Sequence, residues 1–260
     1  MTLGDRETTE SDDITTESIE PSAKGSRLIS KVLAPAVRLW LRSQVEHVEA
    51  LNVEITAGDR QILSGYIQQI TLSAKHAIYQ GLALNQLHLT GQNIRVNAGQ
   101  IVRGKPLQLL EPIRIEGSVL LEEADLNASL KAPLLKAGVT EFLMTLLRSG
   151  AAGISSERDL NLQNLTIQLR SQQVVLGATL VSDSGNEIPI AIRTGFDLAA
   201  PNLLRLVNPQ WLPHATAKRG LPLSDLDGYT FNLGDETEIH ELAIDPEKVT
   251  CQGKLIVLPA

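Results

Sequence analysis

The feature that most constrains this chain is an alternation of aliphatic and polar residues that returns many times after residue 50. Leu51, Val53 and Ile55 alternate with polar residues, and a period of two recurs over 70–74, 87–96 and 160–192. Successive side chains of a β-strand point to opposite faces, so this pattern is typical of strands with one buried and one solvated face. The sequence therefore predicts a fold dominated by antiparallel strands, with turns at its glycine-rich breaks.

Two segments interrupt the alternation. Residues 75–81 (KHAIYQG) fit either a β-bulge or a helical turn, and the sequence does not separate the two. Residues 201–207, which begin with a proline, are predicted to form a short helix.

The segment over residues 27–46 has the pattern of an amphipathic helix. At about 100° per residue, Leu33 and Trp40 fall on one side, opposite a row of basic residues. Proline fits the first turn of a helix, so the helix is predicted to begin near Pro35. It either lies on an anionic membrane or packs its apolar side on its own domain, and both interpretations stay open. The predicted membrane-docking residues are Arg27, Lys31, Arg38, Trp40 and Arg42.

A second amphipathic helix is predicted after Glu122, Glu123 and Asp125. Acids at a helix start satisfy free N–H groups and the positive end of the dipole. We prefer this capping role to a catalytic carboxylate pair or a calcium site, because no EF-hand spacing follows. Pro133 restarts the helix, and its apolar face comprises Leu135, Val139, Phe142, Leu143 and Leu146.

Charge is concentrated in the first 26 residues, where seven acidic residues stand against two basic ones. This segment has almost no apolar content, so we expect a disordered acidic tail (1–26) ahead of a single domain (27–260). The tail holds −5 of the formal net charge of −7, which leaves the domain nearly neutral. A neutral domain with few aromatic residues lacks a basic surface and stacking platforms, so no nucleic-acid partner is expected.

The chain carries no enzymatic motif. Dinucleotide-binding, P-loop, nucleophile-elbow and zincin signatures are all missing. The five histidines are scattered, and Cys251 is the single cysteine, so no metal, cofactor or catalytic residue is expected. The N-terminal residues lack an export signal, and no apolar run approaches the ~20 residues of a spanning helix. We therefore expect a cytoplasmic protein that is not secreted.

Three segments carry a resemblance to a known family: SGYIQQITLSAKHAIYQGLALNQLHL, VRGKPLQLLEPIRIEGSVLLEEADLNASLKAPLL and GKLIVLPA. With the helix before them, they resemble the cyanobacterial branch of the LmeA-like phospholipid-binding family, from about residue 27 to the C-terminus. The resemblance implies an α+β fold like that of tubular lipid-binding domains, in which a long curved, mostly antiparallel sheet wraps around one or two amphipathic helices. It also implies an apolar groove between the helix over 126–147 and the strands over 67–96. The expected groove residues are Ile70, Leu72, Leu87, Leu89, Leu130, Leu135, Val139, Phe142, Leu143 and Leu146.

The leading functional hypothesis is a non-enzymatic phospholipid-binding protein, peripheral to the plasma membrane or a thylakoid membrane, that holds acyl chains in this groove. Its expected partners are a membrane lipid and an anionic membrane surface. The 42 leucines suit smooth walls for acyl chains, although a dense core alone also explains them. The alternative is an assembly factor or scaffold that binds an apolar segment of a protein partner in the same groove.

Overall fold

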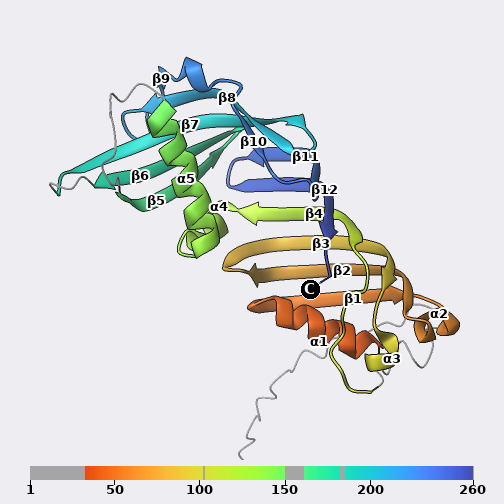
Figure 1. Ribbon diagram of the computed structural model, residues 1–260. Coiled ribbons are helices and arrows are strands. Elements are labelled where there is room, and N and C mark those ends of the chain that lie inside the picture. Colours follow the sequence, from red (N-terminus) through yellow and green to blue (C-terminus); the bar gives the residue numbers. More distant parts are fainter. Residues whose placement is uncertain (1–32, 102, 150–160, 182–184, 260) are drawn as a thin grey trace, which may run out of the picture.

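The computed structural model describes residues 33–101, 103–149, 161–181 and 185–259, which form two antiparallel sheets (Figure 1). The predicted acidic tail, Arg27 and Lys31 lie outside these residues. The first sheet has the strand order β1 (His47–Thr56), β2 (Tyr66–Tyr79), β3 (Leu82–Arg95), β4 (Ile113–Glu122), β12 (Lys248–Val257) and β11 (Thr237–Asp245). The second has the order β10 (Thr230–Asn232), β8 (Leu203–Leu212), β7 (Glu187–Ala200), β6 (Gln173–Val181) and β5 (Asn161–Arg170), with β9 (Leu221–Pro222) paired to β8.

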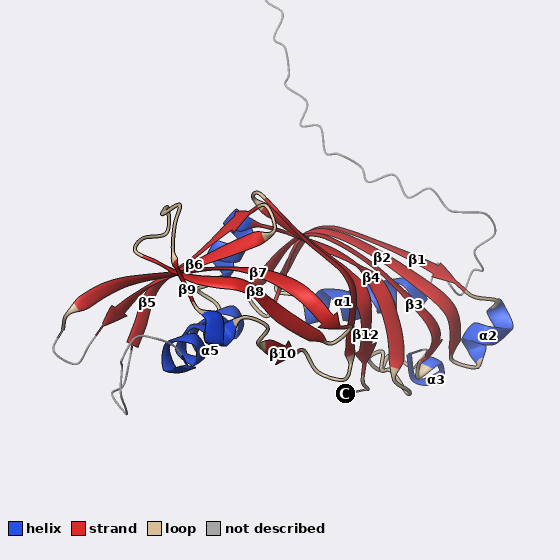
Figure 2. Ribbon diagram, turned by 90° about the horizontal axis from the view of Figure 1, so that it is seen from above, coloured by secondary structure: helices blue, strands red, loops and turns tan. Residues whose placement is uncertain are grey.

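The prediction of antiparallel strands is confirmed, since every strand pair described is antiparallel. The single long sheet implied by the resemblance is replaced by two open sheets, joined by backbone hydrogen bonds. Gln172 N–H donates to Ile244 O at 2.8 Å, and Ile239 N–H donates to Pro201 O at 2.6 Å. Figure 2 shows that the strands arch and that the two longest helices lie on the same side of them.

The predicted long helices are present. α1 (Ala34–Gln44) has Pro35 in its first turn, and α5 begins at Pro133 as expected. Both starts follow from the fixed backbone angle of proline and its missing N–H, which the first turn of a helix does not use. α5 spans Pro133–Ser149, and the remaining helices are α2 (Asp59–Leu63), α3 (Ala98–Ile101), α4 (Glu123–Ser129) and a 3-10 turn at Ser224–Leu226.

Residues 75–79 continue β2 and 80–81 form a tight turn, so the helical turn is absent, and the unbroken register of β2 with β1 and β3 shows no inserted bulge residue either. His76 has φ 46° within β2, and the turn to β3 uses Gln80 (φ 49°) and Gly81 (φ 76°). Asn93 (φ 55°) has the same left-handed backbone within β3. The strand register stays unbroken at both residues, and the left-handed conformation changes which face the following side chains occupy. Ile94 therefore stays on the same apolar side of the sheet as Leu89 despite its odd spacing.

The short helix predicted over 201–207 is absent, which corrects that expectation. Pro201 and Asn202 form the turn between β7 and β8, and the following residues enter β8. Here the long-range pairing of β8 with β7 overrides the local helix signal.

The molecule has two hydrophobic cores, one for each sheet. In the first, α1 packs on the first sheet: Val37 and the N-cap residue Leu33 share one buried cluster with strand residues such as Val53 and Leu72. In the second, α5 packs on the second sheet through Val139 and Leu143. The three phenylalanines meet in the second core, with the ring of Phe142 5.1 Å from that of Phe231 and 6.1 Å from that of Phe196.

The short helix α4 links the two sheets. It follows β4 of the first sheet, and its side chains satisfy the backbone of β5, the edge strand of the second. The Asn127 side-chain amide donates to Ile167 O at 2.7 Å and accepts from Ile167 N–H at 2.9 Å. The Glu123 carboxylate accepts from Leu169 N–H at 2.6 Å. The capping role predicted for the acids is therefore incomplete: Glu123 covers a sheet edge, and Glu122 makes no side-chain cap.

Candidate functional site

The structure distributes the predicted groove residues over two places. Ile70, Leu72, Leu87 and Leu89 belong to the first core, on β2 and β3. Leu130, Leu135, Val139, Phe142 and Leu143 belong to the second core, around α5. The side chain of Leu146 lies outside the described part of the structure. Leu143 is 0% exposed, so its contacts are fully protein-internal, and the two sets do not form a single groove.

The first sheet has one apolar face, which we call the inner face because α1 packs on it. Side chains directly opposite each other on paired strands share a face. One such row crosses all six strands from β1 to β11 and is apolar throughout: Leu51, Ala74, Leu87, Val119, Cys251 and Leu242. A nearby row on the other face is polar throughout: Glu54, Thr71, Thr90, Glu116, Lys254 and Glu238.

Helices cover the two ends of the inner face and leave its middle open. α1 covers the part formed by β1, β2 and β3, and Leu121, Val249 and Ile244 pack into the second core. Figure 1 places β4, β12 and β11 between α1 and α5. Their inner-face residues between these covers belong to neither core and are partly exposed, Leu255 most of all at 47%. We call this set the open strip; it consists of Val119, Ile239, Leu242, Cys251 and Leu255.

Two paired glycines let the sheet bend at the open strip. Gly117 of β4 lies opposite Gly253 of β12. A Cβ atom on Gly117 would lie 2.0 Å from His88 O, and one on Gly253 would lie 2.3 Å from Glu238 O. No larger residue fits where neighbouring backbones approach so closely. The glycines thus permit the strong curvature visible in Figure 2.

An apolar crevice lies beside the open strip, between α1 and the first sheet. Its cavity volume is about 80 Å³, and it widens into space that is open to solvent. Three of the predicted groove residues, Ile70, Leu72 and Leu89, line it. Trp40 and Leu41 of α1 form one wall, and Leu107 and Leu109 form another. Every lining residue is apolar, which suits an acyl chain and offers no partner to a polar ligand.

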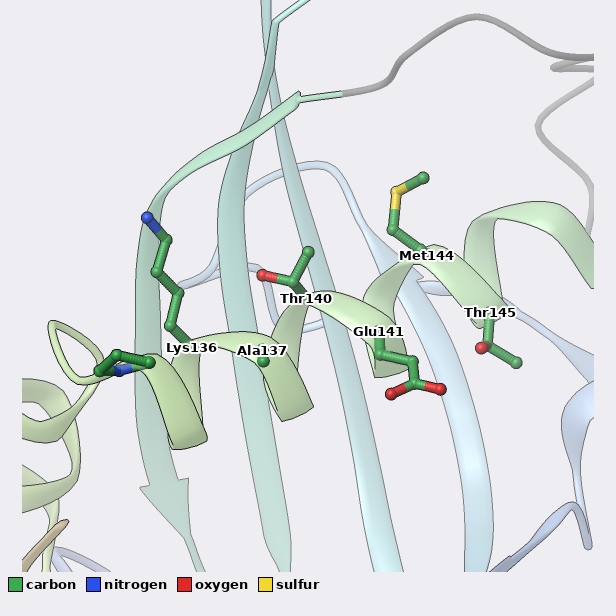
Figure 3. Close-up of a pocket in the computed structure, with 7 residues that line it drawn as sticks. Lys136, Ala137, Thr140, Glu141, Met144 and Thr145 are labelled. Atoms are coloured by element: carbon green, nitrogen blue, oxygen red, sulfur yellow. The ribbon is translucent and has the colours of Figure 1, made fainter. Parts of the chain in front are cut away.

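A second hollow lies along α5 and has a different character. Figure 3 shows Lys136, Thr140 and Met144 in one row along this helix, and Ala137, Glu141 and Thr145 in the adjacent row. Charged and hydroxyl groups line this hollow together with apolar surface, whereas the crevice under α1 has apolar lining residues alone.

The predicted docking residues of α1 are divided between the interior and the surface. Trp40 is half-buried and lines the crevice, Arg38 is half-buried, and Arg42 is exposed. The apolar side of α1 therefore packs on its own sheet. Leu39 is the exception, because 73% of this residue is exposed.

Polar chemistry is sparse in the described residues. They contain no group of three or more His, Cys, Asp or Glu side chains placed to hold a metal ion. His76 pairs with Glu49, and His88 Nδ1 lies 2.9 Å from Ser73 Oγ, both pairs being solvent-exposed. Burial raises the pKa of the Cys251 thiol, so it stays neutral and contributes apolar surface to the open strip. Among these same residues, no helix has the length and hydropathy to span a bilayer.

Sequence reasoning missed the open strip. Its signal is present in the alternation of 115–121 and 249–257, which identifies an apolar face. The alternation does not predict which part of that face a helix will cover.

Comparison with known proteins gives one match. The model of the LmeA-like phospholipid-binding family matches residues 24–254. No curated protein and no solved structure matches the chain. Because the matched range spans nearly the whole chain and includes both sheets and α1, the chain belongs to the LmeA-like phospholipid-binding family.

Proposed function

We propose that this protein binds a phospholipid without catalysing a reaction on it, with acyl chains lying on the open strip and in the crevice under α1. The observation that carries the proposal is the inner face of the first sheet, which is apolar across six strands and uncovered in its middle. Exposed apolar surface costs about 25 cal/mol per Å² in water, so a folded protein keeps such a strip where a ligand covers it.

The chemistry of the strip favours flexible hydrocarbon over a rigid or polar ligand. Its side chains are aliphatic apart from the neutral Cys251, and they offer no charge and no strong hydrogen-bond donor. Membership in a phospholipid-binding family agrees with this choice. A polar headgroup would remain at the solvent-exposed margin, because burying it without partners is costly.

The test compares two substitutions on neighbouring residues of β4. Val119 is on the open strip, and Leu120 is half-exposed on the opposite face. Val119→Asp places a carboxylate in the acyl-chain path, whereas Leu120→Asp adds the same charge where no lipid is expected. We expect purified wild type and Leu120→Asp to yield phospholipid on solvent extraction and mass spectrometry, and Val119→Asp to lose most of it.

Circular dichroism melting of both variants controls for unfolding. Absence of lipid from the folded wild type, or equal lipid in both folded variants, would contradict the proposal. Copurification of one stoichiometric protein in place of lipid would favour the assembly-factor alternative.

A further inference from the structure

The end of the first sheet farthest from the second sheet has its own surface. There α2 connects β1 to β2, and α3 with the loop 103–112 connects β3 to β4. These connections meet, since Val96 N–H donates to Gly65 O at 2.8 Å and α2 contacts α3. Both views place α2 and α3 together at this end (Figures 1 and 2). We call residues 57–65, 97–101 and 103–112 the distal rim.

The distal rim exposes large apolar side chains. Leu63 at the end of α2 is 66% exposed, and Leu110 in the loop is 58% exposed. Neither belongs to the first core, although their neighbours Ile62 and Leu109 do. Leu107 and Leu109 line the crevice from inside, so the loop passes from the crevice wall to the outer surface within four residues.

The same rim is basic in an acidic chain. Arg60, Arg103 and Lys105 are all exposed on it. Adding the adjacent Arg95, residues 57–65 and 95–112 hold four basic and two acidic residues, a net charge of +2, against −7 for the whole chain. Within the described residues, neither Arg103 nor Lys105 forms an ion pair that would neutralise it.

A buried asparagine holds the loop in this position. The Asn97 side chain accepts from Gln108 N–H at 2.9 Å and donates to Pro106 O at 3.0 Å. Its backbone N–H donates to Gln108 O at 3.2 Å, and Leu110 N–H donates to Arg95 O at 2.9 Å. The exposed leucine and the basic residues are therefore held on a fixed surface.

We propose that the distal rim docks on an anionic phospholipid bilayer, with Leu63 and Leu110 inserted at the headgroup level, so that the crevice opens toward the membrane there. The entry of lipid into the crevice depends on the proposed function, whereas docking depends only on the residues of the distal rim. Exposed leucines beside arginine and lysine are complementary to the apolar boundary and the negative charge of such a bilayer. Each basic residue near the surface strengthens binding by about five-fold.

The experiment is flotation of the full chain with vesicles of phosphatidylcholine alone or mixed with about one third phosphatidylglycerol. We expect wild type to float only with the anionic vesicles and less at high salt. Leu110→Glu and the double variant Arg103→Glu/Lys105→Glu should each lower binding at least ten-fold. The matched control is Ile188→Glu, because Ile188 is 52% exposed at the start of β7, beside Glu187 and away from the rim; its binding should match wild type.

A second pair tests the competing surface on α1. If Leu39→Glu or Arg42→Glu abolishes flotation while Leu110→Glu does not, the docking surface is α1 and the rim proposal is overturned. Equal loss in Leu110→Glu and Ile188→Glu, or no flotation of wild type, overturns it as well. Lipid extracted from the same purified proteins, before vesicles are added, separates the two proposals. The rim variants should keep the copurified lipid that Val119→Asp loses.

Discussion

The two halves of the molecule use the same architecture, a helix on a curved antiparallel sheet, to different ends. In the second half, α5 seals the sheet, and the segment 213–217 covers its outer face, where Val175 and Ala191 pack against Ala217. In the first half, the outer face is polar and the inner face is only partly covered by α1. The comparison indicates that the second half supplies stability, whereas the first keeps apolar surface available for a ligand.

The largest expected difference concerns one leucine from each half, Leu143 of α5 and Leu242 of β11. Leu143→Ala removes a fully buried side chain from the second core and should lower the free energy of unfolding by about 3–4 kcal/mol. Leu242→Ala on the open strip should cost about 1 kcal/mol, because that side chain is partly exposed and belongs to neither core. Urea unfolding of lipid-free protein measures both, and similar losses would mean that the open strip is packed like a core.

Curvature of the first sheet provides the next test. Gly117→Ala should destabilise the protein by about 2–3 kcal/mol, since the added methyl collides with His88 O. The control is Gly138→Ala in α5, where a Cβ meets nothing within 4 Å. It should stabilise by up to about 1 kcal/mol, because alanine has the higher helix propensity. Thermal melts of both variants check the sign, and a neutral Gly117→Ala would show that the strands can move apart.

Removing the side chain that links the two halves should lower the free energy of unfolding by an intermediate amount. Asn127→Ala leaves the N–H and the carbonyl of Ile167 without their side-chain partner and should cost about 1–2 kcal/mol. Gln163→Ala, an exposed change on the same edge strand, should be nearly neutral. Hydrogen exchange of the Ile167 amide should accelerate only in the Asn127 variant. Unchanged exchange there would mean that α4 does not protect the edge.

The smallest effect concerns an exposed ion pair in the second half. The hydrogen bond from Arg205 holds the pKa of Asp197 below its ordinary value, with help from Leu198 N–H. Because the folded-state pKa is depressed, the stabilisation is present above the unfolded pKa and is lost as the pH falls through the folded pKa. Arg205→Gln should raise the pKa of Asp197 in an NMR titration, with little change in stability near neutral pH because the pair is exposed to solvent.

Much of the fold could be predicted from the sequence because it depends on local patterns. Alternation identified the strands, and Pro35 and Pro133 marked the starts of α1 and α5. Leu72 and Val139 were predicted to line one groove, but local sequence patterns do not determine whether two such distant residues lie together. α5 packs on strands β5–β8, which come later in the chain, and only their long-range pairing places it away from β2.

The candidate site was harder to predict for the same reason. Ile70, Leu72 and Leu89 were expected to line a groove and do line the crevice. Leu242 and Cys251 were not expected, because β11 and β12 join the first sheet from the far end of the chain. The packing of Trp40 against its own sheet also depends on where β2 and β3 lie, which its helical pattern does not encode.

The insertion of β12 beside β4 has a consequence for how the chain is made. During synthesis, β1 to β4 emerge first, with the aliphatic strand β4 at the edge of the partial sheet. About 125 further residues must be synthesised before β12 can pair with β4. Over that interval β4 presents unpaired backbone to any other nascent chain, which is the situation that promotes aggregation. β5 to β8 are consecutive neighbours and can assemble without waiting. The first sheet is therefore completed last, and we expect refolding to be slow and to benefit from a chaperone that shields β4.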